Sequence, residues 1–215
     1  MRLWHPADRG RLFSALVFAL IFAAILFAPT ARDTAAQPVF AKQAGWLLVA
    51  TPRLNDPRFA GTVVLMLCHD AHGAQGVIVN RLISTKPVGE VMERMLGRTP
   101  EQDTGAAMRI HYGGPVRTGH WSYVHSADYA GAGTSVVNDT VSLTSNPEIF
   151  EALARGEGPA KGFLVIGHAG WGPGQLDNEI RRQDWIIIPP DGALVLEDEQ
   201  SSKWRRALER RSLDL

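Results

Sequence analysis

The sequence predicts an α+β domain built on a largely antiparallel sheet. Short apolar runs rich in β-branched residues, which are typical of strands, outnumber the segments with helical spacing. Most of these runs are joined by short turns instead of helices, and this favours antiparallel pairing over a doubly wound parallel fold. The 215 residues are 45% hydrophobic and 20% charged, a composition that supports a single buried core.

The first half of the domain is expected to contain strands, one turn and one helix. Pro52 ends the first strand, because proline has no N–H for a sheet ladder. Two β-branched runs separated by the polar segment 69–75 indicate a hairpin. Apolar residues at i, i+3 and i+4 spacing indicate a helix that Gly97 closes. The expected elements are strands at 46–50, 62–67, 76–80, 109–112 and 121–125, a helical turn at 56–57 and a helix at 87–96, followed by a loop at 98–108.

The second half of the domain has clearer helix boundaries. Ser145-Asn146-Pro147-Glu148 combines a capping side chain with a proline in the first turn, and Gly156 follows the last helical residue. A glycine-rich loop at 168–174 is expected between a buried strand and a further helix. The expected elements are strands around 135–141 and at 161–167 and 185–188, and helices at 145–155, 175–183 and 202–211.

Residues 1–29 are predicted to be a signal peptide or a membrane anchor. Residues 12–28 carry no charge and follow Arg2, Arg9 and Arg11, which is the basic-then-apolar order of a secretory signal. An apolar stretch of this length lies between a signal core and a full bilayer span of about 20 residues, so both alternatives stay open. A start codon assigned too far upstream is a third explanation.

The globular domain is expected to cover residues 45–215. Residues 30–44 are small and polar without periodicity and are interpreted as a linker. The positive-inside rule sends the chain after residue 30 across the membrane. We therefore expect a protein anchored at the inner membrane or released to the periplasm, with membrane contact through residues 12–28 if they are retained. The cytosol is the alternative if the N-terminal segment is not made.

The glycine-rich loop is the strongest local candidate for a binding site. Exposed N–H groups of Gly170, Trp171, Gly172 and Gly174 beside a helix N-terminus would favour the phosphate of a nucleotide or another anion, in an enzyme or a sensor. The sequence has neither G-x-x-x-x-G-K-[ST] nor G-x-G-x-x-G, however. The structural alternative is that the glycines permit tight turns while Trp171 fills the core.

Cys68 is the only cysteine and is a candidate thiol redox sensor, provided that it emerges at a strand end beside a cation. The adjacent His69 would point to the opposite face of a strand, so the two cannot pair as nucleophile and base. A structural zinc site needs four ligands, and no second cysteine cluster supplies them. No metal or other cofactor is expected. The alternative for Cys68 is a small buried apolar side chain.

No catalytic centre is predicted, and the protein is not expected to be an enzyme. The motifs G-x-S-x-G and H-E-x-x-H do not occur. Four further histidines lack ligand-like spacing and are expected to be structural or solvated; they are His111, His120, His125 and His168. Residues 43–215 contain seventeen Lys and Arg against twenty Asp and Glu, and this balance argues against direct binding of nucleic acid.

The basic helix expected at 202–211 has two explanations. Its arginines could contact phosphates or an acidic partner. Alternatively, it is a surface helix that packs Trp204 and Leu208 on the core and leaves its arginines in solvent.

Six segments of the domain together resemble the AlgH/YqgE family of bacterial proteins. They occur in the family's order, cover about residues 45–213, and lie at 45–52, 56–59, 62–64, 76–81, 112–116 and 169–176. The resemblance implies a compact α+β fold whose bifurcated sheet is bent into a pseudo-barrel. It implies no catalytic residues and no DNA-binding motif, although members are commonly labelled transcriptional regulators.

We therefore expect a regulatory or interaction protein that binds another protein or a small anionic ligand near Asn80, Arg81 and the Gly170–Gly174 loop. Two features depart from the family pattern. Most members begin close to Gly45 without an apolar segment, and His168 stands where an aromatic or aliphatic residue is usual. If the domain is exported, it cannot regulate transcription by touching DNA.

Overall fold

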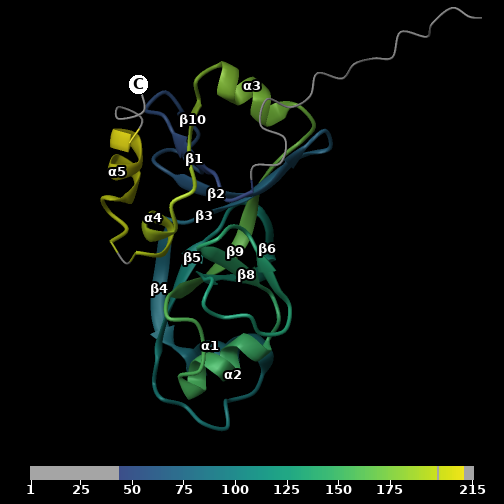
Figure 1. Cartoon of the computed structure of the whole chain (residues 1–215), viewed down its shortest axis with the longest axis vertical. Coiled ribbons are helices and arrows are strands. Elements are labelled where there is room, and N and C mark those ends of the chain that lie inside the picture. The colour runs from purple at the N-terminus through teal and green to yellow at the C-terminus, as the bar shows by residue number, and fades with distance from the viewer. Residues whose placement is uncertain (1–43, 198, 211–215) are drawn as a thin grey trace, which may run out of the picture. The chain divides into compact units, whose positions relative to one another are not determined.

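The computed structural model describes residues 44–197 and 199–210 (Figure 1). The predicted signal or anchor and nearly all of the predicted linker lie outside these residues. Among the described residues, no helix is both long and apolar enough to cross a membrane.

Ten strands and five helices make up the described part of the chain. The strands are β1 (Leu47–Ala50), β2 (Val63–Asp70), β3 (Gly73–Ile78), β4 (Leu82–Pro87), β5 (Ala107–Tyr112), β6 (Val116–Ser126), β7 (Thr134–Val136), β8 (Val141–Thr144), β9 (Gly162–Trp171) and β10 (Trp185–Ile188). The helices are α1 (Val88–Leu96), α2 (Glu148–Arg155), α3 (Gln175–Arg181), α4 (Gly192–Leu196) and α5 (Lys203–Arg210).

The sheet branches at β9. The longest path of neighbouring strands runs β10-β1-β2-β3-β9-β6-β8-β7, and β5 and β4 form a second branch from β9. All pairings of the described strands are antiparallel except that of β5 with β9. The fold is therefore α+β with a curled, bifurcated sheet that forms a half-barrel, which confirms the predicted α+β class. The expected N-terminal hydrophobic helix lies outside the described residues.

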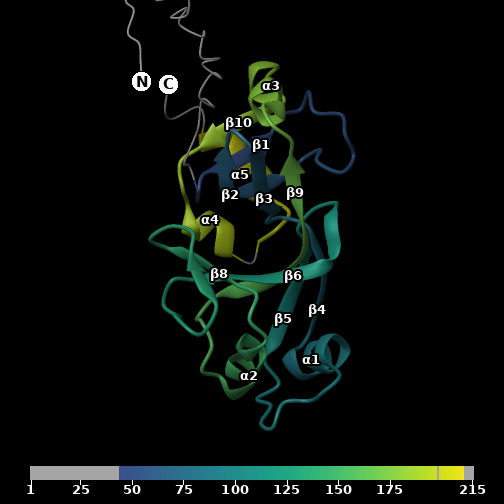
Figure 2. The same ribbon diagram turned by 90° about the vertical axis from the view of Figure 1, so that its right-hand side faces the viewer.

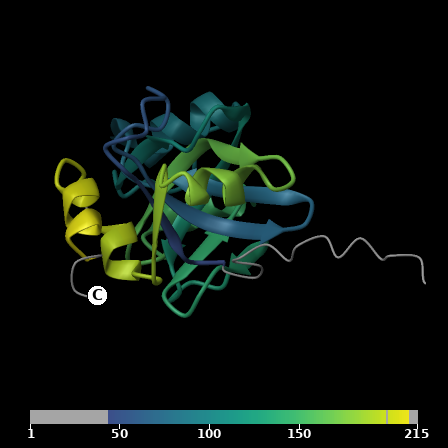
Figure 3. The same cartoon turned by 90° about the horizontal axis from the view of Figure 1, so that it is seen from above.

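Helices flank the sheet at different places. Figure 1 shows α1 and α2 side by side at one end of the domain and α3 at the other, while α4 and α5 lie together along one side. Figure 2 shows β9 running from the end that carries α3 to the branch of β6 and β8. Seen from above, α4 and α5 stand beside the sheet (Figure 3).

Alternate residues of β1 and β2 are buried on opposite faces of the sheet. Leu47 and Leu65 belong to a cluster that α4 and α5 cover, whereas Leu48 and Val64 belong to one that also holds Trp171 and α3 residues. A third cluster lies under α1 and α2. Strands with two covered faces need nearly continuous apolar runs, which explains why these segments were evident in the sequence.

The helix boundaries agree best with the sequence. Gly97 and Gly156 cap α1 and α2 at φ of 69° and 74°, a backbone conformation that glycine adopts without steric strain. The Asn146 side chain accepts a hydrogen bond of 2.9 Å from the Glu148 N–H at the start of α2. The predicted capping chemistry of α2 is confirmed.

Several expectations about strands were wrong. The single strand expected around 135–141 is the hairpin of β7 and β8, and the expected polar loop at 69–75 lies largely within β2 and β3. The glycine-rich loop is shorter than expected, because β9 continues through Trp171. Elements β4 and α4 were not predicted at all.

Glycines allow the connection between β5 and β6 to pass closely over β9. A Cβ atom at Gly114 would lie 2.2 Å from the His168 carbonyl carbon, and one at Gly167 would lie 2.5 Å from the Gly114 oxygen. Both positions also have positive φ, of 147° and 70°. The Gly113-Gly114 pair thus explains one segment on which the family resemblance depends.

Candidate functional site

Arg81 organises the turn at residues 56–60. Its guanidinium donates hydrogen bonds of 3.0 and 3.1 Å to the carbonyl oxygens of Pro57 and Ala60. Within the turn, Arg58 forms an ion pair of 2.7 Å with Asp56, and this contact lowers the pKa of the Asp56 carboxyl. The backbone N–H groups of Phe59 and Ala60 bond to the Asp56 oxygen, so the expected helical turn is present.

Asn80 fixes the start of β2. Its amide oxygen accepts from the Val63 N–H at 2.8 Å and its amide nitrogen donates to the Gly61 carbonyl at 2.9 Å. The side chains of Asn80 and Arg81 therefore hold neighbouring backbone in place, and both also line a groove.

The groove is an open hollow of about 640 Å³ beside β4. It is lined by Asn80, Arg81, Leu82, Ile83, Tyr112, Gln200 and Ser201. Leu82 and Ile83 are 46% and 58% exposed, and the register of β4 on β5 shifts between Leu82 and Ser84. This bulge breaks the alternation of the strand and turns two successive apolar side chains outward.

The Gly170–Gly174 segment lies next to the 56–60 turn. Phe59 from that turn packs on Trp171 with ring centroids 6.3 Å apart. Trp171 is buried and donates its indole N–H at 2.8 Å to the Glu179 carboxylate, which also accepts from Trp185 at 2.8 Å. The structural alternative for Trp171, a core side chain, is confirmed.

The Gly170–Gly174 segment is less favourable for binding an anion than the sequence predicted. Gly170 is a strand residue paired with Gln75, and the Gly172 N–H is bonded to the Gln175 side chain at 3.0 Å. The following helix α3 has seven residues, and Glu179 places a carboxylate beside the loop. Anion binding at Gly170, Gly172 and Gly174 stays a prediction without a supporting contact.

Cys68 is exposed near the end of β2, and not buried as its small apolar alternative required. A register shift between Met66 and Cys68 changes which side chains face outward there. His69 is buried and lies 3.5 Å from the Asp177 carboxylate, so it faces away from Cys68 as predicted. Redox chemistry at Cys68 stays a prediction.

A second hollow, of about 380 Å³, lies between β3, β6 and β9. Its lining includes three basic side chains, Arg117, His120 and His168. Their spacing in the sequence does not predict that His120 and His168 line one hollow, because this depends on the pairing of β6 with β9. The only sequence signal was the glycine pair that permits the crossing.

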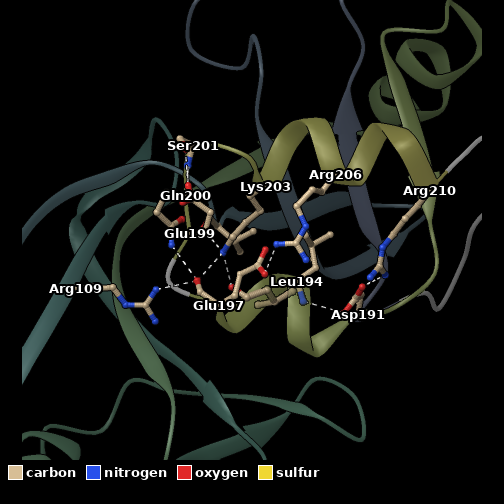
Figure 4. Close-up of polar contacts among 12 residues, drawn as sticks. Arg109, Asp191, Leu194, Glu197, Glu199, Gln200, Ser201, Lys203, Arg206 and Arg210 are labelled. Atoms are coloured by element: carbon tan, nitrogen blue, oxygen red, sulfur yellow. Dashed lines mark hydrogen bonds and ion pairs between the residues drawn. The ribbon is translucent and has the colours of Figure 1, made fainter.

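The C-terminal helix is held by its own basic residues (Figure 4). Arg206 and Arg210 form ion pairs with Glu197 and Asp191. Lys203 is fully buried, and its ammonium donates at 2.8 Å to the Val195 oxygen at the end of α4.

Trp204 and Leu208 pack against the core, and the Trp204 indole N–H donates at 2.7 Å to the Ala50 oxygen. The docked-helix explanation of this segment is confirmed, except that two arginines have protein partners instead of solvent alone.

A neutral histidine lies beside this helix. His111 is fully buried and stacks on Phe163 with ring centroids 4.3 Å apart. Burial, together with the positive charges of Lys203 and Arg109, lowers the pKa of His111 to about 3. The Arg109 guanidinium in turn donates at 3.0 Å to the Glu197 oxygen.

Together, these observations define a class of protein: an α+β half-barrel domain with hollows on its surface, in which the described residues form no cluster of three metal-ligating side chains. Residues 47–215 match the family model described as AlgH-like. The chain belongs to this family, whose function is uncharacterised.

Relatives and solved structures agree with this assignment. A UPF0301 protein of Methylococcus capsulatus is 39% identical over 81% of this chain and 94% of its own length. Another, of Stenotrophomonas maltophilia, is 40% identical over 79% of this chain and 89% of its own. The solution structure of the AlgH protein from Pseudomonas aeruginosa has a TM-score of 0.66 and 28% identity, and covers 79% of this chain and 88% of that one.

Proposed function

We propose that the protein is a non-catalytic interaction protein, and that the groove beside β4 binds an extended segment of a partner protein. The observation that carries this proposal is the pair of successive exposed apolar side chains, Leu82 and Ile83, next to Arg81 in one groove. An exposed apolar pair rimmed by polar groups is typical of a binding surface. Any regulatory role of the protein would depend on the partner protein that the groove binds.

The position of β4 favours an extended partner. Among the described strands, β4 pairs with β5 alone, so one edge of its backbone is open to a further strand. Strand addition would supply main-chain hydrogen bonds, while the groove would select side chains. Lys86 and Pro87 at the far end of β4 limit such pairing to its first residues.

The chemistry of the groove defines the partner segment. Leu82 and Ile83 favour apolar side chains, and Tyr112 adds an aromatic surface. The Arg81 guanidinium already bonds to two carbonyl oxygens and keeps its positive charge, so a carboxylate in the partner would be favoured beside it. The expected ligand is an extended peptide with an acidic residue next to apolar ones.

Selection from a random peptide library displayed on phage tests this proposal, with the full chain held in a mild detergent. We expect enriched peptides that combine apolar and acidic residues and that lose at least about tenfold in affinity on Ile83→Glu, because the new charge would be placed in their apolar contact. Val136→Glu is the matched control, since Val136 is 76% exposed on β7.

Equal binding to both variants would contradict the proposal. So would a set of enriched peptides without acidic residues that bind equally well after Arg81→Gln. Circular dichroism of each variant separates loss of binding from loss of fold.

A further inference from the structure

The second hollow contains basic side chains that make no polar contact with the described part of the chain. Ion pairs hold Arg58, Arg182 and Arg206 elsewhere on the surface. In the described residues, by contrast, Arg117, His120 and His168 have no hydrogen bond or ion pair through their side chains. We infer that this hollow is a binding site for the phosphate group of a small molecule.

An irregularity of β6 creates the site. Val116 pairs with His168 and Trp121 pairs with Ile166. Four residues of β6, at 117–120, therefore stand opposite the single residue Gly167. A bulge of this size pushes the intervening side chains out of the regular ladder, and bulges commonly re-aim side chains beside functional sites. Here it places Arg117 and His120 around His168.

The backbone at Arg117 is strained. Its φ is 50°, in the left-handed region that a side chain with a Cβ adopts at a cost of about 1–2 kcal/mol. A glycine or an asparagine would fit this position with less strain. Keeping an arginine there favours a role for its guanidinium over a role in folding.

The basic groups also oppose one another. Burial lowers the pKa of His168, and the nearby Arg117 and His120 lower it further. Among the described residues, no carboxylate lines the hollow to offset this repulsion. An oxyanion would reverse the effect, because it accepts hydrogen bonds from the guanidinium and from both imidazoles.

The rest of the lining suits a phosphate bearing an organic group. Hydroxyl and amide donors come from Ser122, Ser145 and Gln75, and the oxygens of the two serines lie 2.9 Å apart. Half-buried Trp121 forms an apolar wall against which a planar group can pack. The volume of about 380 Å³ exceeds the needs of a single phosphate.

Nuclear magnetic resonance of imidazole nitrogens tests the inference directly. The full chain, labelled with ¹⁵N-histidine in a mild detergent, is titrated with inorganic phosphate and separately with phenyl phosphate. We expect saturable shifts of His120 and His168, and a rise in the pKa of His168, that sodium chloride at equal ionic strength does not produce.

Arg117→Asn separates binding from folding. Asparagine tolerates the left-handed backbone, so the variant should fold while its affinity for phosphate falls at least about tenfold, as loss of a charge-assisted hydrogen bond implies. The matched control is Arg94→Gln, an exposed arginine on α1, which should bind as the wild type does.

The inference is overturned if Arg117→Asn and the wild type show the same shifts, or if sodium chloride reproduces them. Tighter binding of phenyl phosphate than of inorganic phosphate, lost on Trp121→Ala, supports an organic phosphate. Equal binding of the two supports an inorganic phosphate site. None of these results depends on Ile83, so the proposals for the groove and for the hollow are tested independently.

Discussion

Two groups of basic residues in this domain differ in how their charge is satisfied. Beside α5, Lys203 donates to backbone oxygens and Arg210 pairs with Asp191. In the second hollow, Arg117 and His168 have no such contact within the described residues. Charges that the chain neutralises itself stabilise the fold, whereas charges left unpaired at a strained backbone point to something outside the chain.

Substitutions in the two groups should change the free energy of unfolding in opposite directions. Removal of a charge beside α5 should weaken folding, because the carbonyl oxygens there lose their donors. Removal of the Arg117 charge should leave folding intact or improve it.

Lys203→Met should lower the free energy of unfolding by about 3 kcal/mol, because three carbonyl oxygens lose a hydrogen-bond donor. Urea unfolding followed by circular dichroism measures the change. Lys161→Met, at an exposed position, is the control and should stay within about 0.5 kcal/mol of wild type. Equal stability of the two variants would show that Lys203 does not hold α5.

His111→Phe should remove part of the pH dependence of stability. The native pKa is about 3, below the unfolded value of about 6.5, so below pH 6.5 the unfolded chain takes up a proton that the native state does not. Stability contributed by the neutral ring is present above pH 6.5 and falls by about 2 kcal/mol at pH 5. Unfolding measured between pH 5 and 8 should show a flatter slope for the variant.

The control for this experiment is His72→Phe, since the His72 side chain is 95% exposed. Its pH profile should match that of the wild type. A wild-type slope retained in His111→Phe would place the titrating group elsewhere.

Arg117→Asn should raise the free energy of unfolding by about 0.5–1 kcal/mol, because it relieves backbone strain and removes a charge beside two imidazoles. Arg210→Asn should instead lower it by about 0.5 kcal/mol, since that half-exposed ion pair is partly screened by solvent. Paired urea titrations measure both. If the two substitutions change the free energy of unfolding in the same direction, the proposed difference between the two groups of basic residues is wrong.

Helices and strands could be located from the sequence where burial imposes a regular spacing of apolar residues. Apolar spacing and terminal glycines located α1 and α2 within a few residues, and continuous apolar runs located β1 and β10. By contrast, β4 escaped prediction because an exposed strand shows no apolar alternation. Gly170 was predicted to belong to a loop, although it is a residue of β9.

The candidate sites were less predictable than the fold. Asn80 and Arg81 were singled out through the family resemblance, and the structure places them in a groove. The hollow around His168 depends on a four-residue bulge and on a crossing between distant segments. Neither leaves a local pattern, since the partners are separated by about fifty residues and joined only by tertiary contacts.

The branching of the sheet at β9 affects the order in which the strands unfold. Residues 164–166 of β9 are hydrogen-bonded to β5 on one side and to β6 on the other, and 169–171 extend the same strand to β3. Both branches are therefore paired to β9, and loss of β9 would remove the partner of each. Partial unfolding should therefore begin at the outer strands, and the amide protons of β9 should exchange last, in a single cooperative step for the whole domain.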